Sequence, residues 1–484
     1  MDGAEFPVDR KLHLLKTEGS KNAKLVKPII ICDRLLVKDV KQRTLESMLS
    51  THDIYGSNNN ASRVSILGRT DCIIVELWFS HSMAESVAIK NKPVNNGINS
   101  QSFARKSNLL LRLIRACQPI SRTDIAARLN IDKSTVTETV KPLIAAGIIQ
   151  ESTPEGSTQG RRAKVLSFAD RDECFIGVNL GVRHSQVGLT TMNQEIREEM
   201  EFVTPPDAET ALRMARERIE YLYEKREGRR LRFIGVSVPG VPDARRRSLI
   251  YAPNLNWRNV AIADAFQIDK SVNIVVENDS RAAAMYEARV RIRDSSDDWM
   301  TNFILVRSGT GIGVGLVIGS EVYRGTGPGR GMAGEFGHMT IVAGGKQCVC
   351  GNRGCWEKYA SAASAASLYM GDRPLRHGET VPRFIEIVTK AENGEIRSRK
   401  TLEMIGDYLG IGIANVIMGV GIPRVIVSGR LVYGWQFIKE PLYNAIRRSI
   451  VGRIEGWSVE AGEPAGAAIG GALEVAVDEY IDTL

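Results

Sequence analysis

The sequence has no long apolar run. In 484 residues no hydrophobic stretch approaches the ~20 residues that a membrane-spanning helix needs. The N-terminus also lacks the basic region and apolar core of a secretory signal. These absences argue against the common membrane and secreted classes. We therefore expect a cytoplasmic protein that does not act at a membrane.

Cysteine is scarce and unevenly distributed. The chain has seven cysteines, and three of them, Cys348, Cys350 and Cys355, fall within eight residues in the stretch CVCGNRGC. Disulfides are rare in the cytoplasm, where clustered cysteines more often bind a metal. A disulfide is the alternative, but it would leave one of the three thiols unpaired. A bond between Cys348 and Cys350 would also close a strained ring.

The cysteine spacing favours a structural zinc site. Such a site takes four ligands, preferably Cys sulfur and His nitrogen. The three cysteines supply three ligands, and Gly351 and Gly354 allow the loop to fold tightly around the ion. His338, ten residues before Cys348, is the only histidine close by. We expect zinc to be bound by His338 and the three cysteines.

Length and charge indicate several domains with different partners. A chain of 484 residues exceeds one ordinary core and suggests roughly two to four domains. The net charge is +8, and it is concentrated in one part of the chain. Residues 101–165 hold eleven Lys or Arg against five Asp or Glu. A local excess of this kind is typical of a surface that meets nucleic-acid phosphates.

Residues 1–100 show no sustained helical or strand period. They mix short apolar pieces with polar stretches such as YGSNNNAS. We expect a poorly ordered leader or extension, with a small domain specific to this lineage as the alternative.

Residues 101–168 predict a winged helix-turn-helix. Ser121 is suited to cap a helix that ends at Leu129, Asn130 supplies the turn, and Asp132 can cap the next helix. The stretch from residue 151 to 168 then predicts a hairpin whose loop is rich in Gly and Ser. A helical hairpin used for dimerisation is the alternative.

The second helix of this motif has the pattern of a DNA-reading helix. Val136, Val140 and Leu143 fall on an inner face, and short polar or basic residues fall on the outer face. The hairpin ends in two arginines, which suit the narrow minor groove. We expect operator DNA to be contacted by Lys133, Ser134, Thr135, Thr137, Lys141, Arg161 and Arg162.

From residue 170 to 484 strand-like runs alternate with helical segments. The runs include FIGVNLGV, RFIGVSVPG, VNIVVEND, NFILVRSGTGIGVGLVIG and RVIVSG. This alternation predicts an α/β domain, divided into two lobes.

The motif GEFGH followed by C-x-C-G-N-x-G-C-x-E resembles the signature of the ROK family, named for repressors, open reading frames and kinases. The resemblance covers residues 105–480, including the winged helix-turn-helix of the repressor members. It implies an actin-like, ribonuclease H-like domain of the sugar-kinase type, with two lobes around a sugar cleft. It also implies that the zinc is structural and holds a loop whose neighbours bind the sugar.

The resemblance also implies a set of sugar-binding residues. VVENDSRAAA and APNLNW are similar to family segments at the cleft, and His338 would serve both zinc and sugar. The implied sugar-binding residues are Asn254, Asn278, Asp279, Glu335, His338 and Glu357. Arg281 stands where the family usually has a small amide, which leaves the sugar itself open.

The sequence has some, but not all, of the residues that the kinases of the family use for phosphoryl transfer. Asp279 occupies the position of the catalytic base, and the glycine turn from Gly309 to Gly313 is present. The first phosphate loop, residues 179–183, has Asn179 in place of an acid and Arg183 in place of a small hydroxyl residue. We therefore expect ATP and magnesium not to be used.

These features predict a sugar-responsive transcriptional regulator, most simply a repressor of carbohydrate uptake or catabolism genes. We expect a homodimer or a dimer of dimers, because paired half-sites match two-fold symmetry. One alternative is an active ATP-dependent sugar kinase with a DNA-binding appendage. Another is a binding protein whose cleft receives a protein partner.

Overall fold

The computed structural model describes residues 62–65, 76–79, 107–153, 164–193, 196–294, 302–326, 331–371, 380–464 and 467–484. The chain divides into two compact units, residues 1–96 and 97–484. In the first unit, strands β1 (Ser62–Ser65) and β2 (Glu76–Phe79) pair antiparallel. The predicted poor order of residues 1–100 otherwise concerns positions outside the described residues.

The second unit begins with the predicted helix-turn-helix. A helix over residues 107–117 is followed by β3 (Ile120–Ser121), α3 (Arg122–Leu129) and α4 (Lys133–Ala145). Strands β4 (Ile149–Ser152) and β5 (Val165–Phe168) complete a small sheet of order β3-β5-β4. Ser121 caps α3 by accepting a hydrogen bond from the Asp124 amide, and Asn130 ends that helix with a left-handed backbone at φ 50°. Asp132 lies at the N-cap of α4, but its side chain makes no capping hydrogen bond.

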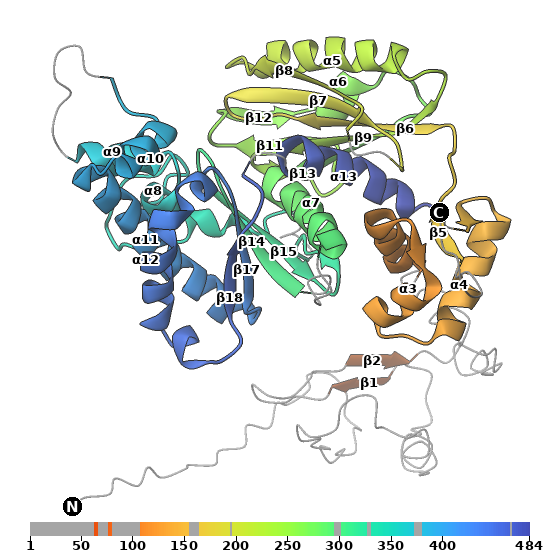
Figure 1. The fold of residues 1–484 in the computed structure, drawn as a ribbon. Helices are drawn as coiled ribbons and strands as arrows, with labels where there is room; N and C mark the ends of the chain where they lie inside the picture. The colour runs from red at the N-terminus through yellow and green to blue at the C-terminus, as the bar shows by residue number, and fades with distance from the viewer. Residues whose placement is uncertain are drawn as a thin grey trace, which may run out of the picture. The chain divides into compact units, whose positions relative to one another are not determined.

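The remainder of the unit contains two five-stranded sheets of the same topology (Figure 1). In each, three strands form an antiparallel meander, and two later strands add in parallel beside the first of them. The first sheet has the order β13-β9-β6-β7-β8 and the second has the order β16-β15-β14-β17-β18. This repeat confirms the expected two-lobed α/β domain.

The strands of the first sheet are β6 (Glu173–Asn179), β7 (His184–Thr190), β8 (Glu198–Val203), β9 (Arg230–Val238) and β13 (Asn273–Asn278). Those of the second are β14 (Asn302–Ser308), β15 (Ile312–Ile318), β16 (Glu321–Val322), β17 (Arg424–Gly429) and β18 (Ser458–Ala461). A third sheet joins β10 (Val241–Pro242), β11 (Leu249–Ala252) and β12 (Trp257–Val260).

Two helices lie between the large sheets. Helix α13 (Ala467–Ile481) packs on β6 and β9, α7 (Asp279–Asp294) packs on β14 and β15, and the two helices pack on each other. The close approach of α13 requires Gly177, because a Cβ there would lie 2.7 Å from the backbone nitrogen of Leu473. The outer face of the first sheet is covered by α5 (Ala208–Glu224) and α6 (Ile262–Phe266).

The second lobe carries the remaining helices. These are α8 (Glu357–Ala360), α9 (Ser364–Met370), α10 (Phe384–Glu392), α11 (Ile396–Val420) and α12 (Trp435–Arg447). Short 3-10 turns cover Glu335–His338, Arg430–Gly434 and Val451–Arg453. Among the described residues, α11 is long and apolar enough to cross a membrane by length and composition alone. Its buried residues, such as Leu402, Leu409 and Ile413, belong to the core of this lobe, so we interpret it as a core helix.

Candidate functional site

The outer face of α4 carries the predicted DNA-contacting side chains. Val136, Val140 and Leu143 are buried against the rest of the module, as predicted. Lys133, Ser134 and Lys141 are exposed, and Thr135 and Thr137 are half-buried. The Lys141 ammonium pairs with Glu138 on the same helix at 2.8 Å, whereas Lys133 projects from the first turn. The helix therefore presents a short polar and basic surface near its N-terminus.

The predicted wing is partly described. Strands β4 and β5 pair antiparallel, with Glu151 opposite Leu166, and Arg122 and Lys164 both contact the Glu151 carboxylate. Arg161 and Arg162 lie outside the described residues, so their expected contact with DNA stays a prediction.

His338, Cys348, Cys350 and Cys355 come together as the spacing predicted. Their potential ligand atoms all lie within 4.8 Å of one another. The Sγ atoms of Cys350 and Cys355 are 3.7 Å apart, and Cys348 Sγ lies 3.6 Å from His338 Nδ1. A tetrahedral zinc with ordinary bond lengths requires edges of about 3.8 Å between sulfurs and about 3.6 Å between sulfur and nitrogen. The residues present therefore fit a tetrahedral ion.

The loop that carries the cysteines is fixed by its own backbone. Gly354 has φ 78°, and a Cβ there would lie 1.8 Å from the Val342 carbonyl oxygen. The neighbouring Trp356 is buried and donates from its indole to the Tyr408 carbonyl on α11. Burial raises the pKa of the Cys348 and Cys355 thiols. Without a cation beside them, these two side chains therefore favour the protonated thiol over the thiolate. A bound divalent cation would reverse that preference.

The cysteine cluster borders a cleft of about 320 Å³ between the lobes. All six predicted sugar-binding residues line it: Asn254, Asn278, Asp279, Glu335, His338 and Glu357. His338 lies between two carboxylates, with Nε2 4.0 Å from Glu335 and Nδ1 3.8 Å from Glu357. Burial raises the pKa of Glu335, with His338 and Arg281 opposing the change. The cleft thus collects acceptors suited to hydroxyl groups beside the cysteine cluster.

Asn278 has a structural task in addition to its place in the cleft. Its Oδ1 accepts from the Ser280 amide at 2.9 Å, and its Nδ2 donates to the Gly240 carbonyl at 2.9 Å. These bonds fix the start of α7, and they occupy part of the polar capacity that we had expected to face a sugar.

Arg281, whose position left the choice of sugar open, does not line the cleft. Its side chain is 1% exposed, and its guanidinium donates to Glu277 at 2.6 Å and to the carbonyls of Gly331 and Ala333. Arg281 therefore holds the backbone of residues 331–333, which lead to Glu335, through two hydrogen bonds. The sequence pattern gave its position but not the direction of its side chain.

Asp279, the expected base position, forms an ion pair. Arg307, on β14, donates from Nη1 to Asp279 Oδ2 at 2.7 Å. The two residues are 28 positions apart, and neither lies in a motif that contains the other, so the sequence pattern did not predict this pairing. The guanidinium therefore occupies one oxygen of the Asp279 carboxylate.

In the loop of residues 179–183, hydrogen bonds engage both polar atoms of the Asn179 side chain. The amide of that side chain donates to Gln186 at 3.2 Å, and its oxygen accepts from the Ser237 hydroxyl at 3.0 Å. Arg183, at the end of the loop, is exposed and lines the cleft. The loop thus has the amide of Asn179 where the family kinases have a carboxylate, and it adds the positive charge of Arg183 to the cleft.

Glu277 is a buried ionic centre that sequence reasoning missed. Its carboxylate contacts Arg281 at 2.6 Å, Arg324 at 2.6 Å and Arg246 at 3.2 Å. Burial opposes ionisation of Glu277, but the three arginines outweigh it and lower its pKa to about 2. Arg246 in turn pairs with Glu479 on α13. Glu277 thus connects the strand end at the cleft with the helix between the lobes.

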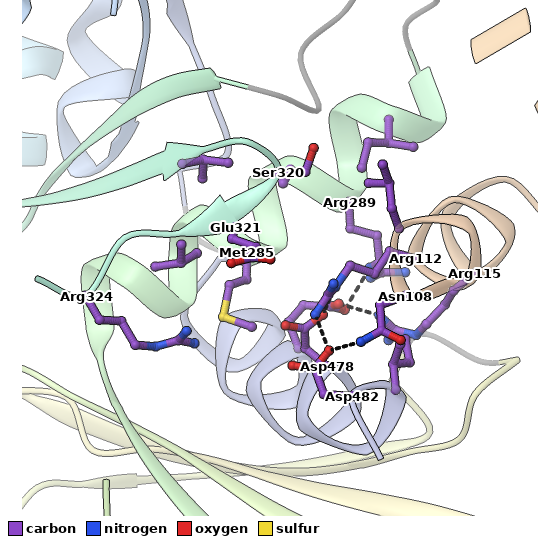
Figure 2. A pocket seen from close by; sticks show the side chains of 17 residues that line it. Asn108, Arg112, Arg115, Met285, Arg289, Ser320, Glu321, Arg324, Asp478 and Asp482 are labelled. Atoms are coloured by element: carbon purple, nitrogen blue, oxygen red, sulfur yellow. Dashed lines mark hydrogen bonds and ion pairs between the residues drawn. The ribbon is translucent and has the colours of Figure 1, made fainter. Parts of the chain in front are cut away.

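A second missed feature joins the DNA-binding module to the lobes (Figure 2). Acids stand at every fourth position on one face of α13 and at the residue that follows it, namely Glu474, Asp478 and Asp482. The helix over residues 107–117 places arginines against them. Arg112 contacts Asp478 and, at 2.7 Å, Asp482, while the buried Arg115 contacts Glu474. These groups line a cavity of about 250 Å³. The four-residue spacing of the acids is a sequence signal for a charged face, although it does not identify the segment that covers that face.

The comparisons with known proteins follow the same division of the chain. Residues 105–150 match the model for winged helix-turn-helix DNA-binding domains, and residues 175–478, more than half of the chain, match the model of the ROK family. The chain belongs to the ROK family. Its two-lobed domain and its helix-turn-helix therefore have the architecture that the cysteine motif implied.

Two curated relatives and one solved structure illustrate the similarity. The xylose repressor of Bacillus spizizenii is 30% identical over 74% of this chain and 90% of its own. The transcriptional dual regulator NagC of Escherichia coli is 28% identical over 67% of this chain and 80% of its own. A crystal structure of a ROK family transcriptional regulator, a homologue of the E. coli MLC protein, covers 79% of this chain and 97% of its own, with a TM-score of 0.62 and 23% identity. That last likeness shows the fold.

Proposed function

We propose that this ROK protein is a sugar-responsive transcriptional repressor that acts in the cytoplasm on genes of carbohydrate uptake or catabolism. The observation that carries the proposal is that one compact unit contains both a winged helix-turn-helix with an exposed polar and basic face on α4 and a cleft lined by side chains that can hydrogen-bond to hydroxyl groups. The printed names of its two curated relatives, a xylose repressor and a transcriptional dual regulator, support the same class of function. The first names xylose and the second names no sugar, so the effector is left open.

Zinc is the metal that the His338 and cysteine cluster suits best. A closed set of one nitrogen and three sulfurs leaves no open position, which is typical of structural zinc. When bound, the ion would fix the loop from residue 338 to 357 and hold His338 in one tautomer. Nε2 of His338 is then directed to the side of Glu335, where a sugar hydroxyl would lie.

The geometry supports a path from the sugar to the DNA-binding module. Helix α7 starts at Asp279 in the cleft, and near its other end the carbonyl of Ile292 accepts from the Arg128 side chain of α3. Helix α13 runs beside it from Ala468 in the cleft to the arginines of residues 107–117. A sugar that favours one arrangement of the lobes would thereby favour one arrangement of the module.

The ion pair of Asp279 argues against the kinase alternative. A base must accept the proton of the attacking hydroxyl, and Arg307 engages the carboxylate that would do so. We propose that Asp279 positions a sugar hydroxyl. A coupled ATPase assay over a hexose panel tests this, because turnover that Asp279→Asn abolishes would establish a kinase.

We also propose that the protein acts as a homodimer or a dimer of dimers. Operator half-sites related by two-fold symmetry are bound by a symmetric pair of reading helices. Sedimentation of the full chain with and without operator DNA measures the assembly directly, and a monomer in both conditions contradicts the proposal.

Lys133→Ala is expected to weaken operator binding by about 1 kcal/mol and to reduce the salt slope by about one. Lys133 is exposed in the first turn of α4 and has no acidic partner on its own helix turn. Fluorescence anisotropy with the full chain between low and moderate salt measures both quantities. Lys270→Ala, an exposed lysine of the first lobe, is the matched control and should change neither.

Arg112→Gln is expected to uncouple sugar binding from DNA binding. The change removes the charged contacts to Asp478 and Asp482 while the cleft stays unaltered. Sugar affinity should therefore be unchanged, while the sugar-induced change in operator affinity falls at least about threefold. Arg213→Gln, which loses an exposed pair with Glu217 on α5, is the control. A normal sugar response in Arg112→Gln would remove this contact from the path.

A further inference from the structure

We propose that the effector is a phosphorylated monosaccharide whose phosphate monoester is bound by Arg183, Arg307 and Arg430 without a metal ion. This inference rests on the proposed function, since it assigns the chemical class of the ligand for the same cleft. It adds an anion subsite that the hydroxyl-binding residues do not provide.

The three arginines reach the cleft from three separate elements. Arg183 ends the turn between β6 and β7, Arg307 is the penultimate residue of β14, and Arg430 directly follows β17. Strands β14 and β17 are parallel neighbours, with Arg307 opposite Ser428, so Arg307 and Arg430 emerge at the same sheet edge. All three line the cleft. Convergence from both lobes onto one opening is the arrangement of a ligand site rather than of a solvated helix face.

The positive charges of this group are incompletely compensated by the protein. Arg307 is paired with Asp279, but in the described part of the chain Arg183 and Arg430 have no carboxylate within ion-pair distance. Glu201, which also lines the cleft, accepts a hydrogen bond from Gln186. Burial lowers the pKa of Arg430, and the neighbouring Arg183 and Arg307 lower it further. Bringing like charges together is unfavourable, and a bound dianion would offset that cost.

The anion subsite adjoins the hydroxyl subsite through a single contact. Asp279 belongs to the set that includes Glu335, His338 and Glu357, and its carboxylate is bonded to Arg307. A sugar hydroxyl that hydrogen-bonds to Asp279 would therefore be separated from Arg307 only by the Asp279 carboxylate. A phosphate esterified at or next to that hydroxyl would meet Arg307 first, with Arg183 and Arg430 beyond it.

A phosphomonoester fits this subsite better than a magnesium nucleotide. The polar atoms of Asn179 are bonded to Gln186 and Ser237, and the position supplies no carboxylate for a metal. Guanidinium groups bind phosphate oxygens in pairs and directly, so no bridging cation is required. The sugar part would still be recognised by Asn254, Glu335, His338 and Glu357.

The test compares aldose phosphomonoesters with their free sugars by isothermal titration calorimetry on the full chain. We expect one phosphomonoester to bind about tenfold or more tightly than its free sugar, because hydrogen bonds between charged groups are the stronger ones. Arg183→Ala and Arg430→Ala should each remove most of that preference and leave the affinity for the free sugar unchanged. Both side chains are exposed, so the folded state should persist. Arg213→Ala on α5 is the control that should keep the preference.

Each other outcome decides against the inference in a distinguishable way. Free sugars that bind and release DNA as well as their phosphates would overturn the anion subsite and leave the proposed function intact. Tight binding of magnesium ATP that depends on Arg183 and Arg430 would assign the arginines to a nucleotide. Binding of inorganic phosphate alone, with no gain from the sugar, would show that the two subsites are not used together. If neither free nor phosphorylated sugars bind, the proposed function falls as well.

Discussion

Glu277→Gln is expected to lower the free energy of unfolding by about 3–5 kcal/mol, because it leaves buried arginines without their common partner. Arg281 is as buried as Glu277, at 1% exposed, and donates to it at 2.6 Å. Arg324 and Arg246 converge on the other carboxylate oxygen. A neutral amide keeps the shape of the side chain but loses the charge that three guanidinium groups face.

Urea-induced unfolding of the full chain, followed by tryptophan fluorescence, measures this effect. Glu217→Gln is the matched control, because Glu217 also pairs with an arginine, Arg213, but on the exposed face of α5. That exposed pair should contribute less than about 1 kcal/mol. A Glu277 variant that is no less stable than the control would show that the ionic centre does not hold the lobes.

The same centre predicts how stability depends on pH. The pKa of Glu277 is lowered to about 2 in the folded chain, so the unfolded chain takes up a proton at higher pH than the folded chain. The stabilising contribution is therefore fully present above about pH 4.5 and is lost as the pH falls towards 2. The Glu277→Gln variant should lack this part of the acid sensitivity. Thermal unfolding from pH 6 to pH 3 of both proteins compares the two slopes.

Cys350→Ser is expected to abolish stoichiometric metal binding and, with it, the response to sugar. The serine hydroxyl is a poor zinc ligand, and the cluster then has only three strong donors. Because His338 belongs both to the cluster and to the cleft, loss of the ion should loosen the sugar site before it unfolds the lobe. Elemental analysis of the purified protein gives the metal content, and a thermal shift with the effector gives the response.

Cys174→Ser provides the control for metal binding. Cys174 is a buried free thiol on β6, in the other lobe from the cluster, so its loss should leave the metal content unchanged. Retention of one zinc per chain by Cys350→Ser would contradict the ligand set. Loss of zinc with an undiminished sugar response would instead separate the metal from the cleft.

Features that depend on local pattern were predicted well from the sequence. The cap at Ser121 and the turn at Asn130 follow from side-chain chemistry within a few residues, and the structure confirms both. The inward side chains of α4 follow from helical periodicity. The cysteine cluster was also found, because three of its four members lie in one loop and the fourth is ten residues away.

Contacts between distant segments were not predicted. The pairing of Asp279 with Arg307 depends on the approach of α7 to β14, and the direction of Arg281 depends on the loop before Glu335. Charge alone could not distinguish these arginines from the many on the surface. The acids of α13 are an intermediate case, since their spacing marks a face but only the fold shows that residues 107–117 cover it.

The most direct test of the central claim is the effect of sugars on operator binding by the full chain. Fluorescence anisotropy with duplexes from the promoter nearest its own gene measures the affinity with and without each sugar or sugar phosphate. We expect one ligand to weaken binding at least about tenfold, which corresponds to about 1.4 kcal/mol of coupling, and Glu335→Gln to lose that effect while still binding DNA. Operator binding that no sugar or sugar phosphate changes would contradict the account.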